Sequence, residues 1–283
     1  MPVTSQQEIA AHARFAFGQN WQRFLSLLDE SRISRAQESL RQMLEVSDLH
    51  GRTFLDIGCG SGLFSLAARR LGARVHSFDY DPQSVACARE LRARYFPEDA
   101  NWRVEEGSAL DTEYLTGLGA FDVVYSWGVL HHTGAMWRAI DRAASMVAAD
   151  GLLALALYRR TPLCGLWRIE KRLYARAPRW AQSVIRGLFK IAYVMALAAS
   201  GRNPCRYIAA YVGNRGMDWR HDVHDWLGGY PYESVRPVEV KRRLAATGFE
   251  TVKIKETHPP LAGLLGTGCD EFIARRGPCR RTG

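Results

Sequence analysis

A glycine-rich turn between a short apolar run and a helical stretch is the feature that most constrains the fold of this chain. Arg52-Thr-Phe-Leu-Asp-Ile leads into Gly58-Cys-Gly60-Ser-Gly62, and Leu63 to Leu71 then has apolar residues at helical spacing. Glycine permits positive φ angles and close approach of a ligand to the backbone, and the start of a helix offers unpaired N–H groups. The pattern predicts a strand, a ligand-binding loop and a helix.

The alternation of strand and helix continues along the chain. Asp81-Pro82 marks a helix start, because an acidic cap precedes a proline that the first helical turn tolerates. Strands that alternate with helices are typical of a parallel sheet with helices on both faces, so the sequence predicts an α/β fold. The predicted strands after the first cover residues 74–79, 101–106, 121–126, 151–158, 249–256 and 270–275, with a helix over 238–247.

Two stretches do not follow this alternation. Residues 1–50 have apolar residues at helical spacing, and between Tyr158 and Val238 the alternation stops for about eighty residues, too long for a plain loop. We therefore predict a helical cap over 1–50, a core over 51–158, an inserted helical lid or acceptor region over 159–237, a helix and strands that complete the core over 238–276, and a tail over 277–283.

Two carboxylates near the glycines indicate what kind of ligand the loop binds. Asp56 precedes the glycines, where it would repel a pyrophosphate but can receive the ammonium of an amino-acid group. Asp79 ends the next strand, where a carboxylate can accept two hydrogen bonds from ribose hydroxyls. A glycine loop alone is weak evidence, since dinucleotide enzymes use similar loops. The two carboxylates favour a ligand with both amino-acid and nucleoside parts.

Four motifs together resemble those of class I S-adenosylmethionine-dependent methyltransferases, in order and in spacing, over residues 52–158. They are Asp56-Ile-Gly-Cys-Gly60-Ser-Gly62, Asp79, Gly107-Ser-Ala109 and Phe121-Asp-Val-Val-Tyr-Ser-Trp-Gly-Val-Leu-His-His132. The resemblance implies a Rossmann-like sheet with helices on both faces, an N-terminal helical extension and a helical insertion after the fifth strand. It also implies S-adenosylmethionine as methyl donor and S-adenosylhomocysteine as product.

The resemblance assigns cofactor-binding roles to individual residues. Ser108 stands where many relatives carry an acid that binds the adenine amino group, so Ser108 or a backbone group would do this less strongly. The implied set is Gly58 and Gly60 around the methionine part, Asp56 at its ammonium, Asp79 at the ribose, Tyr80, Ser108 and Ala109 beside the adenine, and Trp127 after the fourth strand.

Further stretches are similar to bacterial methyltransferases described as ubiquinone-biosynthesis-like, which often accompany surface-glycan or natural-product pathways. They are Phe17-Gly-Gln-Asn-Trp21, Arg32-Ile33, Gly216-Met-Asp-Trp and Asp225-Trp-Leu-Gly-Gly-Tyr-Pro-Tyr-Glu233. In the ubiquinone O-methyltransferases an arginine ahead of the first strand contacts the cofactor carboxylate. By resemblance Arg32 or Arg35 takes that role here, and the alternative for each is a surface helix arginine.

His131 and His132 are the candidate catalytic residues. They follow the fourth strand at the carboxyl edge, where α/β sheets bind their ligands. Methyl transfer to a hydroxyl needs alignment and a base, and an imidazole with a pKa near 6.5 is a fitting base. The second residue of this pair is also histidine in the ubiquinone-type enzymes, which favours His132. The alternative, favoured for His131, is a helix cap or a hydrogen bond to the backbone.

A polar cluster in the insertion is predicted to line the acceptor pocket. His221 and His224 fall one helical turn apart, so a zinc or magnesium site is one alternative and a structural corner is another. No third ligand is found at a secure spacing, and we predict no metal. The predicted acceptor-binding residues are Tyr158, Asp222, Asp225, Trp226 and Tyr230.

The formal charge of +9 suits a phosphate-bearing partner, which could be nucleic acid, anionic lipid or an anionic metabolite. Residues 181–199 are the most hydrophobic stretch, but Arg186 and Lys190 interrupt it, so it is not predicted to span a membrane. This stretch is either a lid helix on the core or a basic amphipathic segment on the inner face of a membrane. Six scattered cysteines without a CxxC pair indicate reduced thiols and a cytoplasmic location.

The predicted function is O-methylation of a small-molecule, glycan or lipid-linked acceptor. A nucleic-acid or nitrogen-directed methyltransferase is the alternative. Ser126-Trp-Gly-Val occupies the place after the fourth strand where amino-directed methyltransferases carry an Asn/Asp-Pro-Pro-aromatic motif, which disfavours that alternative. A protein that binds S-adenosylmethionine without catalysis is a third hypothesis.

Overall fold

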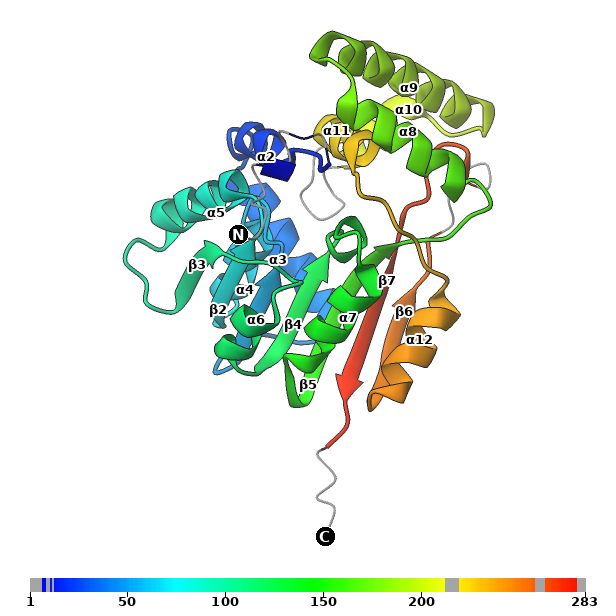
Figure 1. The fold of residues 1–283 in the computed structure, drawn as a ribbon. Helices are drawn as coiled ribbons and strands as arrows, with labels where there is room; N and C mark the ends of the chain where they lie inside the picture. The colour runs from blue at the N-terminus through cyan, green and yellow to red at the C-terminus, as the bar shows by residue number, and fades with distance from the viewer. Residues whose placement is uncertain (1–6, 9–10, 12, 212–218, 258–262, 279–283) are drawn as a thin grey trace.

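The computed structural model describes residues 7–8, 11, 13–211, 219–257 and 263–278. A seven-stranded sheet with the order β3-β2-β1-β4-β5-β7-β6 forms the centre of the molecule (Figure 1). Its strands are β1 (Thr53–Ile57), β2 (Arg74–Asp79), β3 (Trp102–Glu106), β4 (Phe121–Trp127), β5 (Val147–Tyr158), β6 (Phe249–Lys255) and β7 (Cys269–Arg276).

The strands β1 to β5 run parallel to one another, as the sequence pattern predicted. The expectation of a wholly parallel sheet is wrong for β7, which is antiparallel to both β5 and β6. β7 follows β6 in the chain and pairs with it directly, and a pair connected in this way is antiparallel unless a crossover reverses it. The strand order places β1 and β4 side by side, so the loops after both strands meet at one edge.

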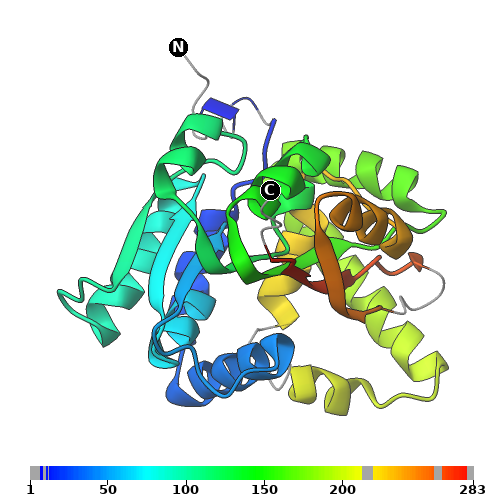
Figure 2. The ribbon, with the colours of Figure 1, turned by 90° about the horizontal axis from the view of Figure 1, so that it is seen from below.

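Helices cover both faces of the sheet, and two separate clusters of buried side chains mark the two faces. In Figure 2 the blue helix α3 and the orange helix α12 lie on opposite sides of the sheet. One face is covered by α2 (Phe17–Leu25), α3 (Glu30–Leu44), α4 (Leu63–Arg70) and α5 (Pro82–Tyr95), and the other by α6 (Thr112–Leu118), α7 (Met136–Ser145) and α12 (Pro237–Ala246).

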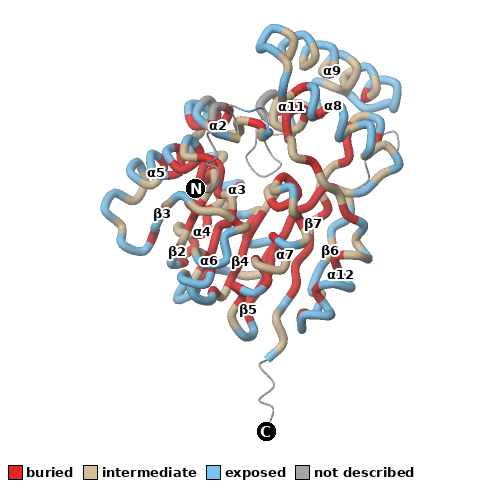
Figure 3. The backbone as a smooth tube through the Cα atoms, viewed as in Figure 1, coloured by how far each residue is buried: buried red, intermediate tan, exposed pale blue. Residues whose placement is uncertain are grey.

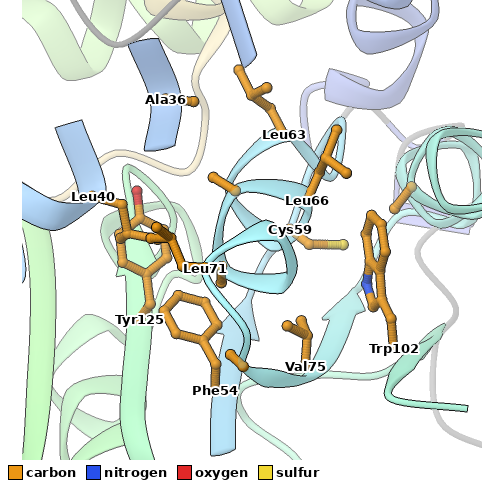
Figure 4. Close-up of a cluster of buried hydrophobic side chains, with 14 of the residues drawn as sticks. Ala36, Leu40, Phe54, Cys59, Leu63, Leu66, Leu71, Val75, Trp102 and Tyr125 are labelled. Carbon is orange, nitrogen blue, oxygen red and sulfur yellow. The ribbon is translucent and has the colours of Figure 1, made fainter. Parts of the chain in front are cut away.

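The core under the glycine-rich loop is closed by α3, from the N-terminal region. Leu40 of α3 is fully buried and lies in one cluster with Phe54 of β1 and Leu66 of α4 (Figure 4). Each such side chain stabilises the fold by about 1.5–3 kcal/mol through its burial. The N-terminal helices are therefore part of the core that holds β1 and its loop.

Four helices stand between β5 and α12, where the sequence predicted a helical insertion. They are α8 (Cys164–Arg176), α9 (Arg179–Ala199), α10 (Pro204–Tyr211) and α11 (Trp219–Gly228). Figure 1 shows them beyond the carboxyl ends of the parallel strands. Tyr174, Val223 and Phe15 share a buried cluster, so the insertion packs on the segment before α2. The Gly216-Met-Asp part of the similar stretch and the basic end of the tail lie outside the described residues.

Candidate active site

A cavity of about 950 Å³ lies between the carboxyl edge of the sheet and the helices above it. The glycine-rich loop, the ends of β2 and β4 and the loop after β3 line one part of it. Side chains of α9, α10 and α11 line another part, and residues 14–21 at the N-terminus also contribute. One cavity therefore joins the glycine-rich loop to the insertion.

The loop after β1 has a backbone that requires glycine. Gly58 has a φ of +74°, and a Cβ there would lie 2.4 Å from Cγ1 of Val129. Gly60 has a φ of +53°, and its Cβ would lie 3.0 Å from the ring of Trp21. Side chains are strained at such φ angles whatever the space around them. The loop can therefore follow a ligand closely only with these glycines.

Asp79 lines the cavity with its carboxylate held by the backbone. The N–H of Gly60 donates to Oδ2 and the N–H of Asp81 donates to Oδ1, both at 2.9 Å. Burial raises the pKa of Asp79 to about 6. A carboxylate has about four lone-pair positions, so two remain for further donors such as a pair of hydroxyls.

Asp56 lies at the end of a buried chain of hydroxyl groups. Ser65 donates to Oδ2 of Asp56 at 2.5 Å, Ser77 donates to Ser65 at 2.7 Å, and the indole of Trp102 donates to Ser77 at 3.0 Å. Burial raises the pKa of Asp56 to about 7. A cationic group bound in the cavity would lower that pKa again, because an opposite charge favours the ionised form.

The predicted adenine-binding residues line the same cavity. These are Tyr80, Ser108 and Ala109, and Trp127 lines it as well. Oγ of Ser108 accepts a hydrogen bond from the N–H of Leu110 at 3.1 Å, so the hydroxyl hydrogen of Ser108 stays available to a ligand. The cavity thus brings together every predicted cofactor residue except Arg32 and its alternative Arg35.

Arg32 does not line the cavity, and Arg14 does. Arg32 lies in the first turn of α3, where its N–H donates to the cap residue Asp29. The guanidinium of Arg14 lies 4.8 Å from the centre of the Tyr80 ring and donates to the carbonyl of His132 at 3.1 Å. The resemblance pointed to an arginine ahead of β1, and Arg14 is an arginine ahead of β1 that lines the cavity.

Residues 13–21 contact both parts of the cavity, a role that the sequence pattern did not predict. The N–H of Gly18 donates to Oδ2 of Asp81 at 2.9 Å, and the N–H of Asp81 in turn donates to Asp79. The N–H of Phe15 donates to the carbonyl of Tyr230 at 3.0 Å, on the side of the insertion. The apolar spacing of this segment predicted its helix, but nothing local indicated that its rings would face a cavity.

His132 is buried and lines the cavity with one nitrogen fixed as a donor. Its Nδ1 lies 2.7 Å from the carbonyl of Pro231, which can only accept, so Nδ1 carries the hydrogen and Nε2 the lone pair. Burial lowers the pKa of His132 to about 3, and the charges of Lys171 and Arg14 act in the same direction. The expected pKa near 6.5 is therefore wrong, and the imidazole is neutral throughout the physiological range.

His131 is fully buried and is not among the residues that line the cavity. Its Nδ1 accepts from the N–H of Tyr158 at 3.3 Å, and the two ring centres lie 3.9 Å apart. Burial holds the pKa of His131 well below its usual value. This geometry fits the alternative given for His131, a hydrogen bond to the backbone, and it fixes the position of Tyr158.

Most of the predicted acceptor residues line the cavity together with further aromatic rings. Asp222 accepts from the hydroxyl of Tyr211 at 2.7 Å, and burial raises the pKa of Asp225 well above its usual value. Tyr230 is not among the lining residues. Its backbone carbonyl accepts a hydrogen bond from the N–H of Phe15. The lining residues of this part include Tyr158, Phe189, Tyr193, Tyr207, Tyr211, Trp219, Asp222, Asp225 and Trp226, and we call it the aromatic chamber.

Lys171 is a fully buried charged residue behind the aromatic chamber, and no pattern in the sequence indicated its role. Its Nζ donates to the carbonyl of Trp226 and lies 4.4 Å from that ring and 5.4 Å from the ring of Tyr158. Burial lowers the pKa of Lys171 and raises that of Glu170. The ammonium fixes the two rings that form one wall of the chamber.

The metal alternative depends in part on a side chain that lies outside the description. No group of three or more His, Cys, Asp or Glu residues among those described is arranged to hold a metal ion. The side chain of His221 is not described. His224 contacts protein groups instead, since its Nδ1 lies 2.8 Å from the hydroxyl of Tyr174.

Comparison with known proteins identifies the domain. The family of methyltransferase domains matches residues 55–153. A ubiquinone biosynthesis O-methyltransferase of Xanthomonas campestris pv. campestris is 36% identical over 114 residues, which are 40% of this chain and 46% of that protein. The corresponding protein of Xanthomonas oryzae pv. oryzae is 35% identical over 115 residues, 41% of this chain and 46% of that protein. The chain thus spans about half the length of these relatives.

Solved structures extend the likeness to most of the chain. Magnesium protoporphyrin IX methyltransferase from Synechocystis PCC 6803 with bound S-adenosylhomocysteine has a TM-score of 0.52 at 16% identity, over 87% of this chain and 83% of that one. An O-methyltransferase family protein from Burkholderia thailandensis has a TM-score of 0.55 at 14% identity, over 99% of this chain and 64% of that one. Likeness at such low identity concerns the fold.

The fold and the matched domain define a class. The chain has the fold of the class I S-adenosylmethionine-dependent methyltransferases, and residues 55–153 match the family of methyltransferase domains, so the predicted fold class is confirmed. Within that class, the curated relatives named above are ubiquinone biosynthesis O-methyltransferases, in agreement with the resemblance in the sequence motifs.

Proposed function

We propose that this chain is an S-adenosylmethionine-dependent methyltransferase that methylates an oxygen atom of a small, largely aromatic acceptor. The observation that carries the proposal is a single cavity in which Asp56, Asp79 and His132 face the same space as the aromatic chamber. A donor and an acceptor can therefore lie end to end within one enclosure, as an in-line displacement requires.

The residues of the first part of the cavity fit S-adenosylmethionine. Asp56 is a buried carboxylate suited to an ammonium, and Asp79 has acceptor positions for two ribose hydroxyls. Gly58 and Gly60 leave the space that a Cβ would fill. When bound, the cofactor supplies an electrophilic methyl group on a sulfonium. The part of this chain is to hold the cofactor, align it with the acceptor and exclude water.

His132 is the proposed base for the acceptor hydroxyl. The hydrogen bond from Nδ1 to Pro231 leaves the lone pair of Nε2 to accept the proton of the hydroxyl as the oxygen attacks. A base whose pKa is as low as about 3 assists most when the proton it accepts is acidic. Phenolic hydroxyls, with pKa values near 10, are far more acidic than sugar or alkyl hydroxyls. The proposal therefore favours a phenolic acceptor over a glycan.

The aromatic chamber supports the same class of acceptor. Rings of Phe189, Tyr193 and Trp226 are suited to stacking on a planar acceptor. The names of the relatives refer to ubiquinone biosynthesis and to magnesium protoporphyrin IX, both of which concern small molecules. Free thiols at the five described cysteines are consistent with the cytoplasmic location that we include in the proposal.

The test has two stages. Calorimetric titration measures binding of S-adenosylmethionine and S-adenosylhomocysteine, and release of S-adenosylhomocysteine is then measured with a panel of catechols, simple phenols, sugars and RNA. Turnover with a catechol or phenol, lowered about a hundred- to ten-thousand-fold in His132→Gln with cofactor affinity unchanged, is the expected result. The matched control is His50→Gln, at an exposed histidine away from the cavity. Turnover with RNA alone would contradict the proposal.

A further inference from the structure

The outer side of the insertion carries most of the exposed apolar side chains of the molecule. Twelve large apolar side chains of the described residues are exposed, and eight of them lie on α8 and α9. Figure 3 shows the exposed outer side of α9, the outermost helix of the molecule. Isolated exposed apolar residues are ordinary, but these eight recur at helical spacing along two consecutive helices, and exposed apolar stripes of this kind mark an interaction surface. We call this surface the α8–α9 face. Its residues are Leu166, Ile169, Leu173, Trp180, Val184, Leu188, Ile191 and Met195.

The α9 helix is apolar on two sides for two different reasons. On its inner side, Phe189, Tyr193 and Leu197 line the cavity. Its outer residues recur every three or four positions from Trp180 to Met195, with exposed fractions of 55–73%. Such spacing places them in one stripe along the helix. Lining the cavity explains why the inner side of α9 is apolar, but it does not explain the apolar outer side.

The positive charge of the chain is concentrated in the same helices. Residues 163–211 contain nine basic and one acidic residue, whereas the remainder of the chain contains 29 basic and 28 acidic residues. Arg172, Arg176 and Arg179 are exposed beside the apolar stripe, and none of the ion pairs between described residues includes them. The α8–α9 face therefore combines exposed apolar side chains with exposed arginines that form no ion pair among the described residues.

We propose that the α8–α9 face docks on an anionic lipid bilayer, with α9 lying in the plane of the membrane surface. An apolar stripe bordered by arginines is the composition that binds at the boundary between headgroups and acyl chains. A second copy of the chain would bring two faces of the same high positive charge together, so charge complementarity favours lipid over self-association. The inference goes beyond the proposed function and does not depend on methyl transfer.

The contacts of α9 argue for a helix on the membrane rather than through it. Within the described residues, α9 is the one helix long and apolar enough to cross a bilayer. However, Arg186 of α9 donates to the hydroxyl of Tyr174 at 3.1 Å and to Oγ of Ser183 at 2.9 Å. The ring of Phe189 lies 5.1 Å from that of Trp226. Insertion across a bilayer would break these contacts and open the chamber.

The experiment is co-sedimentation of the full chain with vesicles of phosphatidylcholine, with and without phosphatidylglycerol. We expect binding to the anionic vesicles that weakens at high salt, since salt shortens the ~10 Å Debye length at 0.1 M. Each basic residue near the surface contributes about fivefold to partitioning, so Arg172→Gln with Arg176→Gln should lower it about 25-fold. Leu188→Glu should abolish it, and Val238→Glu, at a matched exposed position on α12, should not.

Several results would overturn the proposal. These are a chain that stays in the supernatant with anionic vesicles at low salt, equal binding by Leu188→Glu and the parent chain, or a dimer in solution that Leu188→Glu dissociates. Circular dichroism and S-adenosylhomocysteine affinity report whether the variants fold. If Leu188→Glu does not fold, Ile191→Glu tests the same stripe at another exposed position.

Discussion

Cofactor affinity should depend steeply on pH through Asp56 and Asp79. In the free protein, burial raises their pKa values to about 7 and about 6. A bound cofactor would bring an ammonium to Asp56 and two hydroxyl donors to Asp79, and both interactions favour the ionised carboxylates. The pKa values must then fall on binding, and binding at low pH must release protons. Affinity is therefore expected to weaken as the pH falls.

The size of this effect follows from the two pKa values. At pH 5, Asp79 lies about one unit and Asp56 about two units below its pKa, and each unit corresponds to about 1.4 kcal/mol. The two carboxylates together should weaken binding by about a thousandfold between pH 8 and pH 5. Of this, about tenfold belongs to Asp79.

Calorimetric titration of S-adenosylhomocysteine from pH 5 to pH 8, in buffers of different ionisation enthalpy, gives both the affinity and the number of protons released. Asp79→Asn keeps one acceptor oxygen but loses the charge, so at pH 8 its affinity should be lower by roughly 1.5–3 kcal/mol. Between pH 8 and pH 5 the affinity of this variant should fall about tenfold less than the affinity of the parent chain. Asp141→Asn is the control, because the half-exposed carboxylate of Asp141 pairs with Arg243 and does not line the cavity.

An affinity that stays constant from pH 8 to pH 5, without proton release, would refute the assignment of both carboxylates. If the pH dependence is present but Asp79→Asn retains it in full, Asp79 is not a ribose ligand and Asp56 acts alone. In that case the hydrogen bonds from Gly60 and Asp81 would be the whole role of Asp79.

Three further predictions concern stability and the wall of the chamber. Because the pKa of His132 is lowered, the neutral imidazole contributes stability that is present above pH 6.5 and lost as the pH falls toward about 3. In urea unfolding, the free energy of unfolding of His132→Gln should therefore depend on pH less steeply than that of the parent chain, by about 1.4 kcal/mol per pH unit between pH 6 and 4. Equal slopes for the two chains would contradict this. Gly58→Ala should lower the free energy of unfolding by about 1–3 kcal/mol and weaken S-adenosylhomocysteine binding, because its Cβ meets Val129; unchanged binding would show that the loop adapts. Lys171→Met should free the carbonyl of Trp226 and raise the KM for the acceptor, with little change in cofactor affinity. A loss of cofactor affinity without a change in this KM would show that Lys171 does not support the wall of the chamber.

The core of the fold could be predicted because its signals are local. The run before Gly58, the cap at Asp81 and the apolar strands each depend on residues adjacent in the chain, and the strand boundaries from Arg74 to Asp79 agree with the structure. The direction of β7 was not predictable in this way. Its apolar pattern is the same in either direction, and only the connection from β6 decides.

Much of the candidate site depends on contacts between distant residues, which a single sequence does not reveal. Arg14 meets His132 across 118 positions, and Lys171 meets Trp226 across 55. The pKa of His132 was mispredicted for the same reason, since the insertion and the N-terminal segment together bury that imidazole. Arg32 was chosen by its place ahead of β1, a criterion that Arg14 also satisfies.

Residues 13–21 connect the cofactor half of the cavity to the acceptor half within a single short segment. Arg14 contacts Tyr80 on one side and the carbonyl of His132 on the other, while Phe15 contacts Tyr230. If a ligand in one half of the cavity orders residues 13–21, the ligand that binds second in the other half does not have to bear the entropic cost of ordering them. By linkage, the factor by which S-adenosylhomocysteine tightens acceptor binding must equal the factor by which the acceptor tightens S-adenosylhomocysteine. The N-terminal segment would thus make binding of the proposed donor and acceptor cooperative, although the two would contact different sets of side chains.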